Sequence, residues 1–403
     1  MQIDKITTHA NASFKSGWGN WALLYCSIFF FIANLFAAIA IFPAYSLSIG
    51  STPFQAGLQN TAFGLTAVLL RLFLGPVMDR QGPKLLMLLG IFTFATTPLL
   101  LLLSPSFNML LAARIYQSLG LAVVLPGIWT IIAEMAPPGK IGTYLGVSRI
   151  FTNLSLLTGP SAALFIIGSF GYNHWFILSA ITSTLSLALM ATVKTPDIQI
   201  KTAKTASSWN LIKKAMAIKQ IYPVIAGIAL FSFTYSAVIS FAAVHVEIAA
   251  PGSEAAYFFI ILGLTGIIAS LGAGVLSDRF GRRNIALPML IILGIGTTLF
   301  SLLHLWPALV IICAVILGIG IQGSSLVFTA WLIDISKPGL RATTISIQEN
   351  TIDILFSIGA LAFGLAAQGP GLSIAFLVTG IVTITAVLPL YKASAALINK
   401  NPH

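Results

Sequence analysis

Twelve runs of predominantly apolar residues fill almost all of this 403-residue chain. A helix needs about 20 such residues to cross the hydrocarbon core of a bilayer. We therefore predict twelve transmembrane helices. The expected ranges are 18–46, 56–78, 84–104, 107–135, 141–168, 172–193, 219–246, 255–276, 284–303, 306–334, 341–366 and 371–393.

Charged residues are scarce and are confined to particular places. Only 8% of the residues are charged, whereas a soluble domain carries about 25%, so the medium around this chain must be membrane lipid. Of the 21 Lys and Arg residues, three lie within spans and all the others fall on one side of them. Because Lys and Arg accumulate on the cytoplasmic side, we expect both termini and the central linker to be cytoplasmic. The net charge of +11 then reflects topology, and nucleic acid is excluded as a partner.

The chain divides into two halves of six spans each. Residues 194–218 form a polar, Lys-rich connection after the sixth span. We predict one six-helix bundle over residues 1–193 and a second over residues 219–403. The expected fold class is an all-α membrane protein made of two six-helix repeats.

Two copies of the pattern G-x-x-x-D-R-x-G lie in corresponding hairpins of the two halves, over residues 75–82 and 274–281. Glycine permits a tight turn and close helix approach, and an Asp followed by Arg can hold neighbouring helix ends by charge-assisted hydrogen bonds. We assign a gating role to these hairpins and to the acids that end spans four and ten. The residues are Gly75, Asp79, Arg80, Glu134, Gly274, Asp278, Arg279 and Asp334.

The acids Glu134 and Asp334 are expected to contact the hairpin arginines. Such contacts would exist only with the cytoplasmic side closed, and they would stabilise an outward-facing state. Two parallel six-helix repeats joined by a cytoplasmic linker indicate an alternating-access transporter, with its binding site between the halves near mid-membrane.

These features resemble the major facilitator superfamily over essentially the whole chain. The two hairpins resemble its motif A, residues 114–117 resemble its motif B, and residues 159–160 resemble the core of its antiporter-associated motif C. Residues 70–75 and 133–139 resemble its bacterial drug-efflux-like branch, which includes sugar-efflux-like permeases and exporters of metallophores and siderophores. Two positions depart from the pattern. Pro83 stands where motif A usually has a basic residue, and span one lacks the acid of several proton-driven multidrug members.

The resemblance implies a secondary active transporter of the bacterial inner membrane, and not an enzyme. It implies proton-coupled export of a small organic molecule such as a metallophore, siderophore or drug, by an antiporter that works as a monomer. The proton gradient is the expected energy source, with no cofactor and no metal site. The family fold also implies a substrate cavity lined by spans one, four, seven and ten.

Five charged residues lie inside predicted spans, where an unpaired charge costs several kcal/mol and therefore marks function. They are Arg71, Arg114, Arg149, Glu349 and Asp353. Glu349 and Asp353 are about one turn apart on the same helix face. At about 1.5 Å per residue, Asp353 lies roughly 18 Å into its span, near the bilayer centre. Low dielectric and mutual repulsion make one of the two acids a candidate proton carrier.

The three arginines have different expected partners. In the family fold span two packs near span eleven, so Arg71 is expected to face Glu349 or Asp353, either as a switch or as a permanent ion pair. By resemblance, Arg114 is the motif B arginine, which transfers protons or holds an anion; the alternative is a brace for neighbouring helices. Arg149 either pairs across the interface or contributes positive potential.

Aromatic and amide side chains on spans one, four, seven and ten suit amphiphilic organic substrates, or else they serve helix packing. The predicted substrate-binding residues are Arg114, Arg149, Phe30, Asn34, Gln117, Trp129, Phe231, Tyr235, Gln322 and Trp331. His245 and Glu247 end span seven on the outer side, and we expect them to form a solvated rim.

Two further functions stay open beside export. Import or exchange of organic anions would use the buried arginines of the first half to hold carboxylates. A receptor or sensor on the same fold is disfavoured, because both hairpins and the buried charges are intact. Catalysis has no support in the sequence.

Overall fold

The computed structural model describes residues 17–103, 105–137, 141–195, 208–251, 255–336 and 340–399. These residues form thirteen α-helices. Twelve of them are long and apolar enough to cross a membrane, as predicted. The helices are α1 (Trp18–Ser48), α2 (Pro53–Gln81), α3 (Pro83–Leu103), α4 (Phe107–Met135), α5 (Ile141–Phe170), α6 (Tyr172–Thr192), α7 (Ser208–Met216), α8 (Ile221–Ala249), α9 (Ala255–Phe280), α10 (Arg282–Phe300), α11 (Leu309–Ile335), α12 (Arg341–Gln368) and α13 (Leu372–Asn399).

The predicted spans match the twelve long helices to within a few residues. The sequence predicts that the tenth span begins at residue 306, but the residues before Leu309 form turns. The short helix α7 lies within the linker, for which the sequence predicts only a polar connection. It carries Lys213 and Lys214 in its last turn, where positive charge interacts favourably with the helix dipole.

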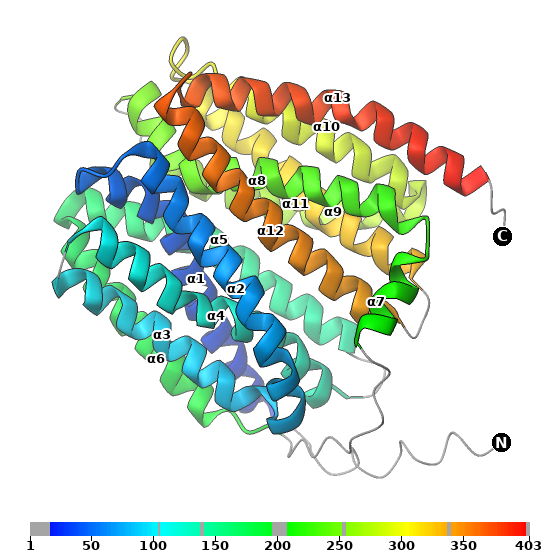
Figure 1. The fold of residues 1–403 in the computed structure, drawn as a ribbon, viewed down its shortest axis with the longest axis horizontal. Coiled ribbons are helices and arrows are strands. Elements are labelled where there is room, and N and C mark those ends of the chain that lie inside the picture. The colour runs from blue at the N-terminus through cyan, green and yellow to red at the C-terminus, as the bar shows by residue number, and fades with distance from the viewer. Residues whose placement is uncertain are drawn as a thin grey trace.

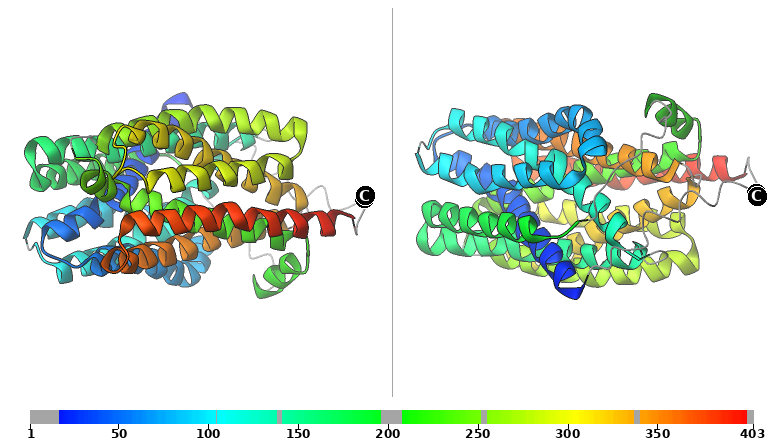
Figure 2. Two further views of the ribbon diagram at one scale, coloured as in Figure 1. Left: turned by 90° about the horizontal axis from the view of Figure 1, so that it is seen from above. Right: turned by 90° about the horizontal axis from the view of Figure 1, so that it is seen from below.

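Each helix contact of the first half has a counterpart in the second. Helix α1 packs on α5 and α6 as α8 packs on α12 and α13, and α4 packs on α2 and α3 as α11 packs on α9 and α10. Figure 1 shows the two groups, α1–α6 and α8–α13, side by side. Both views in Figure 2 show the spans running roughly along the longest axis of the molecule.

The two ends of the bundle are distinguished by the linker. Asn20, at the start of α1, donates through Nδ2 to the carbonyl of Lys194 beyond α6 at 2.8 Å. Arg283, at the start of α10, donates to the carbonyl of Tyr391 near the end of α13 at 3.3 Å. We name this the linker end, and the opposite end the far end.

Glycines form the tight turns of both hairpins, as predicted. Gly82 and Gly281 end the two G-x-x-x-D-R-x-G patterns and have φ angles of +79° and +90°. This left-handed region is readily available only to glycine. Helices α2 and α3, and likewise α9 and α10, therefore follow one another after a single connecting residue.

The two halves are packed tightly against each other in the far-end part of α2 and α12. A Cβ on Gly57 would collide with the backbone of Ala360 and Gly364, and one on Gly64 would collide with Ser357. Thr61, between these two glycines, donates to the carbonyl of Ser357 at 2.8 Å. Small residues thus bring the two helices into backbone contact.

A second tight contact joins α5 to α9. Gly263 of α9 lies against Leu157 of α5, where an added Cβ would come within 2.7 Å of the Leu157 Cα. Together, the two contacts close the space between the halves toward the far end.

At two positions nearer the linker end the same helix faces lack such a contact. Gly75 lies about three turns beyond Gly64 on the same face of α2, and Gly146 is similarly related to Leu157 on α5. Within the part of the chain that the structure describes, no neighbouring side chain or opposing backbone lies within 4 Å of a Cβ added to either glycine. The halves therefore touch at the far end and are separated at these positions near the linker end.

Candidate functional site

A cavity of about 210 Å³ lies between the two halves. Its walls come from α1, α2, α4 and α5 of the first half and from α11 and α12 of the second. Aliphatic side chains line much of it, together with the aromatic residues Phe36, Phe63, Trp129 and Phe356. An apolar cavity with few polar groups is typical of sites for small organic ligands.

The charged lining of this cavity consists of Arg149, Glu349 and Asp353. The sequence predicts a functional role for all three. The family resemblance implies a cavity lined by spans one, four, seven and ten. The charged residues at the cavity come instead from spans two, five and eleven. Helices α2, α5 and α12 therefore contribute to the site in addition to α1, α4 and α11.

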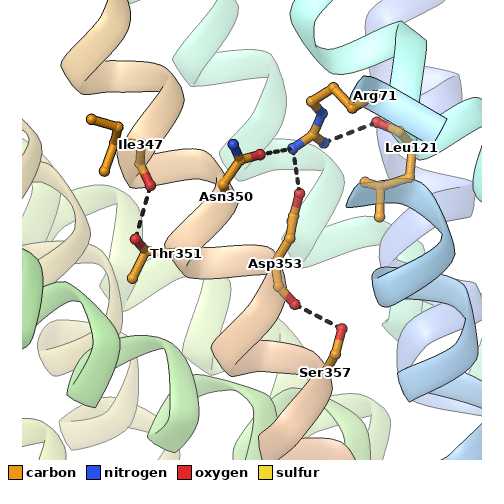
Figure 3. Close-up of polar contacts among 7 residues, drawn as sticks. All are labelled: Arg71, Leu121, Ile347, Asn350, Thr351, Asp353 and Ser357. Carbon is orange, nitrogen blue, oxygen red and sulfur yellow. Dashed lines mark hydrogen bonds and ion pairs between the residues drawn. The ribbon is translucent and has the colours of Figure 1, made fainter. Parts of the chain in front are cut away.

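An ion pair joins the two halves at the cavity wall. Arg71 Nη1 of α2 lies 2.7 Å from Asp353 Oδ2 of α12, and their side chains are only 18% and 15% exposed. The same guanidinium donates to Asn350 Oδ1 at 3.1 Å and to the Leu121 carbonyl at 3.5 Å (Figure 3). The Ser357 hydroxyl donates to the Asp353 carbonyl at 2.7 Å and belongs to the close contact with Gly64.

The small residues of α2 explain why this pair can form. Gly64 lies two turns from Arg71 on the same face, and it lets α12 approach to backbone distance. A larger residue at this position would move the helix axes apart, and Arg71 would lose reach to Asp353. The ion pair thus depends on the close packing beside it.

Arg149 and Glu349 face each other across the same cavity without touching. Arg149 Nη2 donates to Ser325 Oγ of α11 at 3.3 Å, a bond that also crosses between the halves. Glu349 interacts electrostatically with Asp353, Arg149 and Arg71. Among the described residues, however, it forms no ion pair within 4 Å. The site therefore holds one ion pair in contact, Arg71–Asp353, and one pair of opposite charges that do not touch, Arg149 and Glu349.

Arg114 lies behind the cavity wall rather than in it. It is fully buried and donates to Gln117 Oε1 at 2.6 Å and to Asn60 Oδ1 at 2.7 Å. Its guanidinium stacks over the Phe63 ring at 3.7 Å from the centroid, while Phe63 itself lines the cavity. Asn60 also donates to Ser240 Oγ of α8 at 3.2 Å, so the network reaches the second half.

The other predicted binding residues are divided between the cavity and helix packing. Trp129 lines the cavity. Tyr235 contacts the lining residue Phe356 from behind, with ring centroids 5.7 Å apart, and Phe231 stacks on Tyr235 at 5.5 Å. These three residues belong to the site or to the layer that supports it.

Four other residues of that set lie away from the cavity. Asn34 bonds Thr182 and Ser179 of α6, and Phe30 lines a separate pocket between α1, α5 and α6. Gln322 lies against Gly266 of α9. Trp331 stacks on Phe328 within the second half.

A family model confirms the resemblance seen in the sequence. The Major Facilitator Superfamily model matches residues 24–274 and 225–402. The chain belongs to this superfamily. It is therefore a multi-pass membrane protein of a transporter family, and members of this family are not enzymes.

Two curated relatives are similar to this chain at low sequence identity. The quinolone resistance protein NorA of Staphylococcus aureus is 25% identical over 144 residues, which cover 36% of this chain and only 37% of NorA. An uncharacterized MFS-type transporter of Methanocaldococcus jannaschii is 22% identical over 347 residues, covering 83% of this chain and 87% of that protein. The NorA match thus spans little more than a third of that relative.

Solved superfamily structures share the whole fold. A nucleoside transporter NupG variant has a TM-score of 0.77 at 14% identity, covering 94% of this chain and 99% of that one. A bacterial homolog to the human lysosomal transporter Spinster, in an inward-facing and unoccupied conformation, has a TM-score of 0.74 at 17% identity, covering 97% and 100%. At such identities the likeness shows the fold alone.

The second superfamily hairpin is held by an arginine outside the predicted set. Arg282, the first residue of α10, pairs with Asp278 and, through Nε at 2.8 Å, with Asp334. The predicted arginine, Arg279, lies over the Phe280 ring instead, 5.3 Å from its centroid. The turn at Gly281 places Arg282 four residues after Asp278, within reach of both acids. The sequence contains a signal for this contact, because two arginines, Arg282 and Arg283, directly follow Gly281.

The corresponding region of the first half is described only in part. The side chains of Asp79 and Arg80 lie outside the described residues. Glu134 is partly buried, and its Oε2 has no hydrogen-bond partner among the described residues. Gly75 has open space beside it, and Gly274 lies near Leu326.

Of the two residues expected to form a solvated rim at the end of span seven, one is buried and one is exposed. His245 is 1% exposed, and its Nε2 lies 2.9 Å from the Phe300 carbonyl, with the Phe300 and Phe376 rings around it. The histidine therefore belongs to the packing of the second half. Glu247, two residues on, is exposed at the far end as expected.

Proposed function

We propose that this protein exports a small organic molecule across the bacterial inner membrane by alternating access, in exchange for protons. The observation that carries the proposal is the Arg71–Asp353 ion pair, which links the two halves at the wall of the cavity. Both termini would be cytoplasmic, which makes the linker end the cytoplasmic end. The protein would work as a monomer in lipid, with no energy source other than the proton gradient.

Protonation of Asp353 would act directly on the contact between the halves. In the present arrangement the far end is closed and Asp353 bears the charge that pairs with Arg71. Taking up a proton removes this attraction and leaves Arg71 with its neutral acceptors, Asn350 and Leu121. The contact between α2 and α12 is then weaker, which lowers the barrier for the proton-loaded protein to change between its two states.

Glu349 supplies a second acid within the same electrostatic network. It lies one turn from Asp353 and faces Arg149 without a closed ion pair. A substrate or a proton arriving in the cavity changes the charge that both acids experience. Glu349, Asp353 and Arg71 are therefore the proposed coupling residues.

The cavity lining favours an amphiphilic substrate. Phe36, Trp129 and Phe356 provide flat apolar walls, while Arg149 and Glu349 offer charges of both signs. Among relatives, NorA is named as a quinolone resistance protein, which supports a drug-like or metallophore-like molecule. Arg149 and Trp129 are the proposed direct contacts. Arg114, Gln117, Phe231 and Tyr235 would shape the wall from behind.

The hairpins are the proposed gates. When the linker end closes, the hairpin of one half would meet the other half. Residues Gly75, Asp79 and Arg80 of the first half and Gly274, Asp278 and Arg279 of the second would then act with Glu134 and Asp334. Arg282 joins this set because it already bonds Asp278 and Asp334.

The test is transport in proteoliposomes with an imposed pH gradient. Candidate substrates are metallophores, amphiphilic cations and organic anions. We expect gradient-driven flux in the natural protein, and loss of gradient dependence with retained exchange in Asp353→Asn. Thr351→Val is the matched control, because among the described residues the Thr351 hydroxyl bonds only within its own helix, to the Ile347 carbonyl at 2.8 Å (Figure 3).

Organic-anion exchange is the second candidate, and Arg149 favours it. This arginine lines the cavity, and within the described part of the chain it donates one hydrogen bond, of 3.3 Å, to a neutral hydroxyl. Its guanidinium therefore has donors left for a carboxylate. If flux is independent of the pH gradient and requires an anion on the opposite side, the protein is an anion exchanger and not a proton-driven exporter. Arg149→Gln should then abolish it.

A further inference from the structure

A second and larger cavity lies at the far end, apart from the central one. Its volume is about 1000 Å³, against about 210 Å³ for the central cavity. Helices α1, α5 and α6 of the first half and α8 and α9 of the second form its walls. The two cavities share no lining residue. We name it the rim cavity.

The rim cavity combines one acid with hydroxyl and aromatic groups. Among the described residues that line it, Glu247 is the only charged one. The carboxylate interacts electrostatically with the Tyr172 hydroxyl, and Tyr172 and Ser48 line the same cavity. Phe165 and Ile248 are 64% and 67% exposed and supply apolar surface beside the acid.

The distribution of charge along the chain reinforces this acid. No Lys or Arg lies in any of the far-end connections, whose charged residues are Glu247 and Glu254. A recess lined by one sign of charge between low-dielectric walls concentrates the opposite ion. Cations are further attracted to the faces of aromatic rings. The far end therefore favours positive ligands and repels anions.

We propose that the rim cavity binds an organic monocation with an apolar body, with Glu247 as the counter-ion and Tyr172 and Phe165 as aromatic contacts. The site is independent of proton coupling and of the direction of transport. Because its walls come from both halves, opening the far end would pull α1 and α5 away from α8 and α9. A bound cation would therefore hold the far end closed. On the proposed topology, in which the far end is the outer end, the site would act as a brake that responds to cations outside the cell.

Protection of a cysteine from labelling tests the site directly. The reporter is Ile248→Cys in a Cys26→Ser/Cys313→Ser background, in lipid-free detergent micelles. We expect tetraphenylphosphonium to slow maleimide labelling about fivefold, the scale of one exposed ion pair with an aromatic contact. Tetraphenylborate has the same shape and the opposite charge, and should give no protection. Glu247→Gln should remove the protection, whereas His304→Gln, which changes a side chain outside this cavity, should keep it.

Several outcomes would overturn the proposal. Equal protection by the two ions would mean that apolar partitioning alone places them there. Protection that survives Glu247→Gln would show that Glu247 is not the counter-ion. Protection by added phosphatidylethanolamine but not by tetraphenylphosphonium would assign the site to a lipid headgroup instead. If Ile248→Cys does not give a monodisperse protein, Leu47→Cys on the opposite wall serves as the reporter.

The assay also separates this inference from the proposed transport function. It requires no gradient and no flux, so a failure of proton coupling leaves its outcome unchanged. Repeating it in Trp129→Ala, which changes a wall of the central cavity and leaves the Arg71–Asp353 pair intact, tests independence from the central cavity. Persistent protection supports a separate site, and loss of protection in that variant would overturn it.

Discussion

Arg71 of α2 and Asp353 of α12 lie 2.7 Å apart and form an ion pair between the two halves. The pair sits where the closely packed part of the two helices ends. On the far side of it, Gly64 and Thr61 contact Ser357. On the linker side, a Cβ added to Gly75 would meet no described residue within 4 Å. The charge pair therefore marks the boundary between the closed and the separated parts of the interface.

The first prediction concerns the cost of breaking this pair. Arg71→Gln leaves a shielded carboxylate without its counter-ion, so we expect about 3 kcal/mol of lost unfolding free energy. The double variant Arg71→Gln/Asp353→Asn removes both charges and should recover at least half of that loss. Unfolding followed by intrinsic fluorescence in detergent measures the difference. Additive losses in the double variant would mean that the two side chains are not coupled.

The second prediction concerns the glycine contact. Gly57→Leu should prevent close approach of α2 and α12, because an added Cβ already collides with the Ala360 backbone. Disulfide formation between Thr61→Cys and Ser357→Cys, without the two native cysteines, should then fall severalfold. Gly146→Leu is the control, since Gly146 faces open space. Unchanged cross-linking in Gly57→Leu would contradict close packing at this position.

The third prediction concerns the arginine behind the cavity wall. Arg114→Lys keeps the positive charge but cannot bond Gln117 and Asn60 together or stack flat on Phe63. We expect a loss of about 2 kcal/mol or more, because a fully buried charge is left with fewer partners. Gln117→Ala, which removes one of the two acceptors, should cost less. Stability of Arg114→Lys equal to that of the natural protein would argue against the bonding network.

The fourth prediction contrasts an exposed network with the buried ones. Arg282→Gln breaks contacts to Asp278 and Asp334, whose side chains are 66% and 52% exposed. Such pairs contribute about 1 kcal/mol or less each, and salt screens them. The loss of stability should therefore be small and should shrink at high ionic strength. The loss from Arg71→Gln should depend much less on salt.

The spans and their number follow directly from the sequence, because the length of an apolar run is a property of the chain alone. The direction in which each helix faces is different. Helices of a membrane bundle are apolar on nearly every face, so periodicity does not reveal which side meets a cavity. For this reason Asn34, for which the sequence predicts substrate binding, lies instead against Ser179 and Thr182.

Charged residues are better guides than aromatic ones. A charge inside a bilayer must find a partner, and this requirement, together with the packing of span two near span eleven in the family fold, gives Glu349 or Asp353 as the expected partner of Arg71. The partner of Arg114 cannot be found in that way. Asn60 is neutral, and nothing in its sequence surroundings distinguishes it from other amides in the spans. The network of Arg114 therefore becomes visible only from the packing.

The positions of Gly64 and Gly75 mean that α2 can couple movement at its far end to movement at its linker end. They lie about 16 Å apart at about 1.5 Å per residue, with Arg71 between them. If the helix stays straight, a tilt that opens a gap at Gly64 must swing Gly75 toward the opposite half. A flexible joint inserted between the two glycines would let each end move alone, and the two gates could then open together and leak. In the proposed function, the stiffness of this one helix would turn two separate closures into a strict alternation.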